Sequence, residues 1–189
     1  MQQTGTTPDT RSVTRPIAQY DGPTIALHWA TAGLVLLQFA LAELWGFFPH
    51  PIHHSMIVLH MSFGLMLTAV IILRIFWRLS FGRALPPAGY GVLDRVAKAM
   101  HHALYVLVGA EVLLGFATRW TDNQPLSFFG LLIPSPLGTF SHATGRFVDQ
   151  IHDYNAWLII ILVAVHAGAA LFHHYVLKDD VLRRMLPPG

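Results

Sequence analysis

The sequence predicts an all-α membrane protein, a bundle of four transmembrane helices with both termini in the cytoplasm. The chain has 189 residues, of which 53% are hydrophobic and only 12% are charged, and its mean hydropathy is +0.49. This composition is far from that of a soluble domain. Four apolar segments are each long enough to cross a hydrocarbon core of about 30 Å at about 1.5 Å per residue. Lysine and arginine are also distributed unevenly along the chain.

The elements follow in order along the chain. Residues 1–23 are polar and without periodicity, so we expect a flexible cytoplasmic tail, and residues 24–189 are expected to form the helical domain. The four spans are predicted at Thr24–Phe48, Ser55–Leu79, Lys98–Thr118 and Ile151–Tyr175. A short hydrophilic link joins the second span to the third. The link over 119–150 contains three prolines and several glycines, and is therefore predicted to be a loop.

The cations orient the bundle. Ten lie in the tail, the 74–98 region and the C-terminal segment: Arg11, Arg15, Arg74, Arg78, Arg83, Arg95, Lys98, Lys178, Arg183 and Arg184. The opposite side has only Arg119 and Arg146. By the positive-inside rule the first side, with both termini, is cytoplasmic. We call it the inner side and the opposite side the outer side.

Composition also limits the chemistry. The chain has no cysteine, which excludes structural disulfides, thiolate zinc sites, iron–sulfur ligation and covalent c-type haem attachment. Histidine, with twelve copies, is the main soft ligand left. The formal charge of +2 gives no indication of a nucleic-acid partner.

Four histidines in apolar spans form two pairs at matched depths. His152 and His166 are 14 residues apart on one predicted helix, which places them on one face about 21 Å apart in height. His28 opens the first span on the inner side, and His60 lies near the outer end of the second. We therefore expect an inner pair, His28 with His166, and an outer pair, His60 with His152.

Paired imidazoles at two levels suit two haem b groups, because each iron needs a ligand from each of two facing helices. A single membrane histidine is more often structural, but four at matched depths favour ligation. On the inner side His101 or His102 could replace a ligand or bind a propionate. His173 suits a propionate or an interfacial contact.

Two acidic residues also lie within the spans. Glu111 is in the middle of the third, where a carboxyl group is expected to be neutral and hydrogen-bonded, with a proton relay to a quinone as the alternative. Glu43 lies near the outer end of the first span, at a depth that suits quinol protons or the surroundings of an outer haem.

These residues together resemble a known family. The pattern comprises His28-Trp29, "GFFP" at 46–49, His60 followed by Gly64 and Arg74, "HHALY" at 101–105, His152, His166 and "HHYVLKDDVLRRMLP" at 173–187. It is similar to prokaryotic cytochrome b561, over nearly all of 25–187. The resemblance implies a four-helix cytochrome b domain of the bacterial inner membrane with two haem b groups, whose ligands fall on the same four histidines.

The resemblance further implies electron exchange with ubiquinone and, in one branch, oxidation of periplasmic superoxide. Arg119 and Arg146 are then candidates to steer this anion toward the outer haem, with pairing to Asp122 and Asp149 as the alternative. We expect an outer surface that oxidises superoxide to carry more cations than these two arginines.

Two other hypotheses about the function stay open. The chain can be a cytochrome b anchor subunit of a hydrogenase or dehydrogenase, with a protein as its redox partner in place of superoxide. It can also be a haem-free transporter whose histidines line a polar path.

Overall fold

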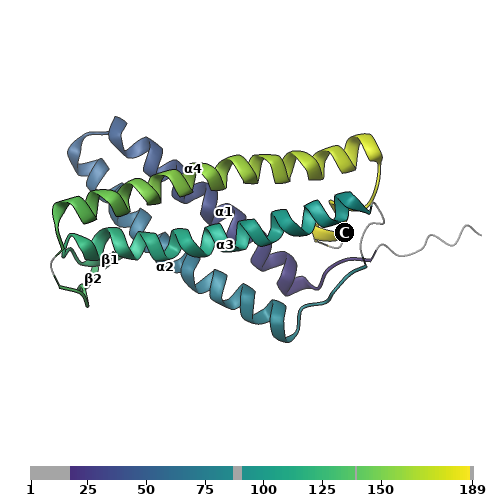
Figure 1. Cartoon of the computed structure of the whole chain (residues 1–189), viewed down its shortest axis with the longest axis horizontal. Helices are drawn as coiled ribbons and strands as arrows, with labels where there is room; N and C mark the ends of the chain where they lie inside the picture. Colours follow the sequence, from purple (N-terminus) through teal and green to yellow (C-terminus); the bar gives the residue numbers. More distant parts are fainter. Residues whose placement is uncertain (1–17, 87–90, 139, 188–189) are drawn as a thin grey trace, which may run out of the picture.

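The computed structural model describes residues 18–86, 91–138 and 140–187, and this part contains four helices long and apolar enough to cross a membrane. The predicted fold class is confirmed. The two ends of the described chain lie at the same end of the bundle (Figure 1), where the Tyr20 N–H donates to the Arg184 carbonyl at 3.1 Å. That this end faces the cytoplasm remains a prediction.

The first two helices form one hairpin. Helix α1 spans Gly22–Leu44 and is followed by a short 3₁₀ turn, η1, at Trp45–Phe47, and helix α2 spans His50–Ser80. Helix α2 begins five residues before its predicted start, because a proline in its first turn suits the N-terminus of a helix. Gly64 lets α1 approach closely, since a Cβ there would lie 2.8 Å from the side-chain nitrogen of Gln38.

The other two helices form a second hairpin, and both are longer than predicted. Helix α3 spans Val92–Thr121 and helix α4 spans His142–Phe172. The Ser141 side chain accepts the Thr144 N–H at 3.2 Å, an N-cap that allows polar residues ahead of the apolar run to be helical. The prediction of a loop over 119–150 is therefore wrong at both ends.

A small β-hairpin also replaces the middle of that predicted loop. Strands β1 (Leu126–Phe128) and β2 (Leu131–Ile133) pair antiparallel, joined by Phe129 and Gly130 at φ 48° and 94°. Two central residues with positive φ make a tight hairpin turn. The fully buried Ser62 of α2 accepts the Phe129 N–H at 2.8 Å. The hairpin is thereby held against α2, two residues from His60.

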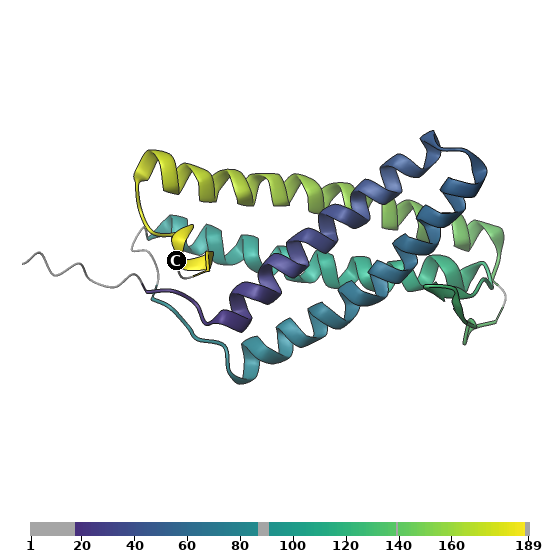
Figure 2. The same ribbon diagram turned by 180° about the vertical axis from the view of Figure 1, so that it is seen from behind.

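The buried core lies midway along the bundle. It consists of Val35, Leu67, Ile71, Val108 and Ile159, with one or two residues from each helix. Along α4, Ile159 is seven residues from both His152 and His166. Figure 2 shows α1 and α2 running obliquely across α3 and α4. The two hairpins therefore meet in the core between the two histidine levels, and each level lies toward one end of the bundle.

The inner end is closed by the C-terminal segment. Helix α4 continues as a π-helical turn, η2 (His173–Leu177), and the chain then reverses at Lys178 with φ 54°. After it, the short 3₁₀ turn η3 (Arg183–Met185) lies against α1, where the Trp29 indole donates to the Met185 carbonyl at 2.8 Å.

The predicted tail at 1–23 is only partly described, since residues 1–17 lie outside the described residues, and its last two residues belong to α1. Asp21 caps this helix and accepts bonds from the Trp77 indole and the Arg83 N–H. Burial raises the pKa of the Asp21 carboxyl, but these hydrogen bonds lower it more, so the pKa lies well below its usual range.

Candidate functional site

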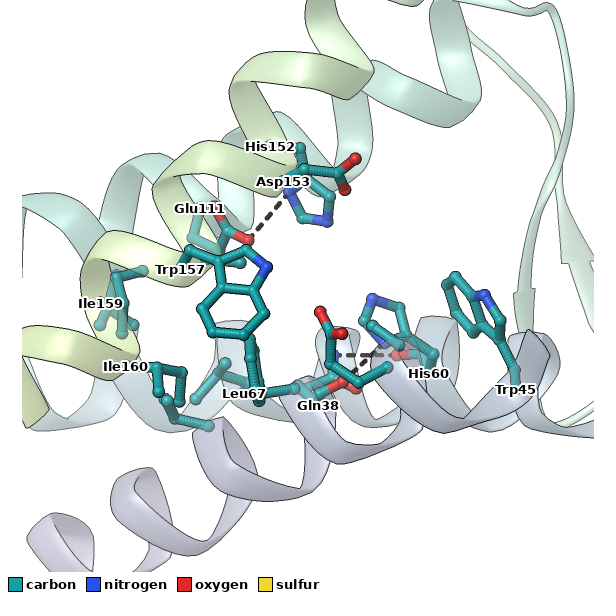
Figure 3. Close-up of a pocket in the computed structure, with 16 residues that line it drawn as sticks. Gln38, Trp45, His60, Leu67, Glu111, His152, Asp153, Trp157, Ile159 and Ile160 are labelled. Atoms are coloured by element: carbon teal, nitrogen blue, oxygen red, sulfur yellow. Dashed lines mark hydrogen bonds and ion pairs between the residues drawn. The ribbon is translucent and has the colours of Figure 1, made fainter. Parts of the chain in front are cut away.

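The outer level brings His60 of α2 opposite His152 of α4. Their ring centres are 6.4 Å apart and their planes are nearly perpendicular, at 88°. Both rings border a pocket of about 310 Å³ between the two hairpins (Figure 3). Its walls include Gln38, Phe39, Glu43, Trp45, Leu67, Val108, Glu111, Asp153, Trp157 and Ile159. Apolar walls and two facing imidazoles are the surroundings that an upright macrocycle requires.

The outer histidines both turn Nδ1 toward an oxygen. His60 Nδ1 donates to the main-chain carbonyl of Gln38 at 3.2 Å. His152 Nδ1 lies 3.1 Å from Glu111 Oε1, although its N–H is not aimed directly at that oxygen. An imidazole with its proton on Nδ1 presents the Nε2 lone pair to a metal. His60 therefore has the arrangement of a metal ligand, and Glu111 lies close enough to His152 to complete the same arrangement there.

Glu111 is held between two helices. Its Oε2 accepts from Asn155 Nδ2 at 2.7 Å, and the same amide nitrogen donates to the Leu107 carbonyl at 3.0 Å. The expectation that this mid-span carboxyl has bonding partners is confirmed. A proton relay through Glu111 stays a prediction.

The inner level is more crowded. His28 of α1 and His166 of α4 have ring centres 6.3 Å apart, with planes at 70°. The ring of His101 from α3 is closer still to His166, at 5.2 Å. Arg74 of α2 lies beside them, with its guanidinium 5.0 Å from the centre of the Tyr105 ring. The predicted inner pair is therefore brought together, but with a third imidazole within reach.

The inner pair also differs in how its first ring is held. Arg74 Nη2 lies 3.0 Å from His28 Nδ1, and a guanidinium can only donate. In this arrangement Nδ1 accepts and the neutral His28 ring has its proton on Nε2. Binding iron through Nε2 would require the proton to leave and Arg74 to turn away. His102 Nδ1 instead bonds the Lys98 carbonyl of its own helix at 2.7 Å, so this side chain is not directed at His166.

The distances at both levels fit a shared metal ion. An imidazole nitrogen lies about 1.2 Å from its ring centre and a metal–imidazole bond is about 2 Å long, so two rings in line across one ion have centres about 6.4 Å apart. The observed 6.4 Å and 6.3 Å agree with this value. The ring spacing therefore fits a bis-histidine haem at each level, and the inner level also requires Arg74 to turn away from His28.

The predicted steering arginines lie away from the outer pocket. Arg119 Nη2 donates to the Pro125 carbonyl at 3.2 Å and borders a second pocket of about 260 Å³ beside β1, while Arg146 is exposed. Neither forms an ion pair with any described residue. The outer pocket is lined by Glu43 and Asp153. Its border is therefore acidic within the described part of the chain.

Some side-chain contacts near the histidines were not predicted from the sequence. His173 Nδ1 lies 2.6 Å from Asp179 Oδ2, and its propionate or interfacial contact stays a prediction. Gln38, Asn155 and Tyr105 were not predicted as parts of a site. The signal for the first two was present, because an amide in an apolar span needs a partner, and Asn155 follows His152 by three residues on the same helix face.

Comparison with known proteins extends these findings. A family model described as prokaryotic cytochrome b561 matches residues 19–188. "Cytochrome b561 homolog 2" of Escherichia coli (strain K12) is 33% identical over 180 residues, which cover 93% of this chain and 95% of the relative.

Two further relatives carry other names. "Cytochrome b562" of Cereibacter sphaeroides is 32% identical over 173 residues, covering 87% of this chain and 92% of the relative. "Probable superoxide oxidase CybB" of Yersinia pestis is 29% identical over 167 residues, covering 86% of this chain and 93% of the relative. Each match covers nearly the whole length of both proteins.

Proposed function

Because this chain belongs to the prokaryotic cytochrome b561 family, we propose that it passes single electrons between a donor on the outer side of the membrane and ubiquinone, through two haem b groups. Family membership and the four spans make it a multi-pass protein of the bacterial inner membrane that binds haem b and serves electron transport. The number of haems, their ligands, the donor and the quinone are our proposal.

The observation that carries the proposal is the pairing of histidines on opposite hairpins at two levels. His60 and His152 would hold one haem, and His28 and His166 the other, with ring-centre distances of 6.4 Å and 6.3 Å. Haem b between two imidazoles changes charge by one electron and leaves no open position at iron for dioxygen. The residues of the chain therefore need only hold and orient the two haems and insulate them from each other and from water.

The helices that carry the ligands set the path for electrons. His152 and His166 lie on one continuous helix, so their levels are about 21 Å apart in height. The core at Val35, Leu67 and Ile159 fills the space between the levels. This apolar packing excludes water midway and keeps the two haem positions separate.

The name of the Yersinia relative suggests superoxide as a donor, and we include it in the proposal as the first donor to test. The acidic border formed by Glu43 and Asp153 works against attraction of an anion, while Arg119 and Arg146 work in its favour from farther away. A cytochrome b anchor subunit would instead take its electrons from a protein.

The test uses the purified chain in detergent or vesicles. We expect Soret and α bands of low-spin haem b, two haems per chain, and quinone reduction on addition of superoxide alone. Haem bands without superoxide-dependent quinone reduction would leave an electron carrier with a protein donor. Absence of haem bands would contradict the whole proposal and favour the histidine-lined transporter.

A further inference from the structure

We propose that Glu111, held by Asn155, is a positioning residue for His152 and lowers the reduction potential of the haem at the outer level. This inference rests on the proposed function, because it concerns a haem held by His60 and His152. It adds a residue on α3, which supplies neither outer ligand, to the outer level.

Glu111 contacts α4 through both of its carboxyl oxygens. Its Oε1 lies 3.1 Å from His152 Nδ1 and its Oε2 accepts from Asn155 Nδ2 at 2.7 Å. The Glu111 and His152 side chains are only 17% and 21% exposed. Each Glu111 oxygen thus faces a nitrogen donor of α4, so both oxygens are placed to accept.

Asn155 fixes the direction of the carboxylate. Its amide nitrogen bonds both Glu111 Oε2 and the Leu107 carbonyl, which lies one turn earlier on α3. The Glu111 side chain therefore has one oxygen tied down and the other turned to the imidazole. Contacts of this kind are often loose before the partner binds and tighten afterwards.

The effect on iron follows from charge. A carboxylate that accepts the Nδ1 proton makes the imidazole a stronger donor through Nε2. Reduction adds one electron to ferric iron and forms ferrous iron with one less positive charge, so a stronger donor and a nearby anion both favour the ferric form. Glu111 therefore lowers the potential of the outer haem.

The inner level has the opposite charge next to its ligand. Arg74 lies 3.0 Å from His28 Nδ1, and a cation favours the ferrous form for the same reason. An anion at the outer level and a cation at the inner level make electron transfer from outer to inner downhill. The direction agrees with a donor on the outer side.

The experiment is a redox titration of the purified holoprotein, with each haem assigned by its absence in His60→Ala or His166→Ala. In Glu111→Gln we expect the ferrous-to-ferric ratio of the outer haem at a fixed potential to rise about tenfold, which is about 59 mV for a one-electron couple. The inner haem should change less than twofold. The ferric low-spin EPR signal of the outer haem should also move.

Glu43→Gln is the matched control. It removes a carboxylate from the same pocket wall, but no described contact joins Glu43 to either histidine. We expect less than a third of the Glu111→Gln shift and an unchanged EPR signal. Equal shifts in both variants would mean that Glu111 acts only as a nearby negative charge, which would overturn the positioning role. The absence of a shift in Glu111→Gln would overturn it as well.

Asn155→Leu covers the case in which Glu111→Gln loses the outer haem. This variant keeps the carboxylate and removes its clamp, so the outer haem should shift about threefold in the same direction. No shift there would overturn the proposal. If the wild-type protein has no outer haem, the proposed function itself is wrong. The titration of the wild type shows this before any variant is made.

Discussion

The outer and inner levels each contain a pair of facing histidines, yet the surroundings of the two pairs differ. At the outer level His60 and His152 both turn Nδ1 to an oxygen, from Gln38 and Glu111. At the inner level His28 accepts from a guanidinium, and a third imidazole lies 5.2 Å from His166. The outer level is thus arranged for a metal in advance, whereas the inner level must rearrange to bind one.

Ring spacing and ring protonation are therefore separate requirements for a metal ligand. The two pairs have almost equal ring-centre distances, 6.4 Å and 6.3 Å. Spacing is set by the helices, which the core holds at a fixed separation. The tautomer is set by whichever group faces Nδ1. An anion at one level and a cation at the other also separate the electrical environments of the two sites.

The largest effect is expected at the outer ligands. His60→Ala and His152→Ala should each remove the same haem and leave about half of the wild-type haem content, because one imidazole rarely retains a b haem in bis-histidine form. The measurement is haem per chain by the pyridine haemochrome assay. Loss of different haems by the two variants would contradict the pairing.

The inner level is expected to respond unequally. His166→Ala should remove the inner haem completely, since His166 lies near both candidate partners. His28→Ala should also lose it, whereas His101→Ala should keep both haems with a changed inner α band. His102→Ala is the control and should match wild type, because its ring bonds its own helix. Full haem content in His28→Ala would make His101 the ligand.

A smaller effect is expected from the inner cation. Arg74→Gln removes a charge beside His28, so the ferrous-to-ferric ratio of the inner haem at a fixed potential should fall about tenfold. Arg74→Lys keeps the charge and should shift less than threefold. Spectroelectrochemistry of each holoprotein makes the measurement. A rise of the inner potential in Arg74→Gln would refute the proposed polarity of the two levels.

The smallest effect is expected from the charged residues on the outer side, at the outer pocket and farther from it. Replacement of both Glu43 and Asp153 by their amides should speed superoxide oxidation about two- to fourfold at low salt, from two unit charges at about 10 Å in water. Arg119→Gln combined with Arg146→Gln should slow it by a smaller factor, because both arginines lie away from the outer pocket. Stopped-flow rates measure both, and salt near 1 M should erase both differences. Differences that persist at high salt would mean that steering is not the cause.

Much of this molecule could be predicted from its sequence. The four spans follow from apolar length, and the depth match of the four histidines follows from helical rise, so both pairs meet as expected. The starts of α3 and α4 could not be predicted, because charged residues interrupt the apolar pattern in the first turns, such as Asp94 and Arg95 in α3 and Arg146 and Asp149 in α4. The β-hairpin has Phe129 where a turn of this kind usually has asparagine, so its strongest local signal was missing.

The contacts around the histidines were harder to foresee. Helical spacing alone did not favour His101 over His28 as the partner of His166. The closeness of His101 to His166 depends on how α3 packs against α4. The partners Gln38, Arg74 and Glu111 belong to helices that bring them to the rings only after packing. Such contacts between distant segments are decided by the tertiary structure.

The most direct test of two unlike levels is a redox titration of wild-type protein beside His60→Ala. The proposed difference between the two levels predicts two one-electron waves in the wild type, and the wave at lower potential should disappear in His60→Ala because it belongs to the outer haem beside Glu111. A single wave in the wild type, or loss of the higher wave in His60→Ala, would contradict it.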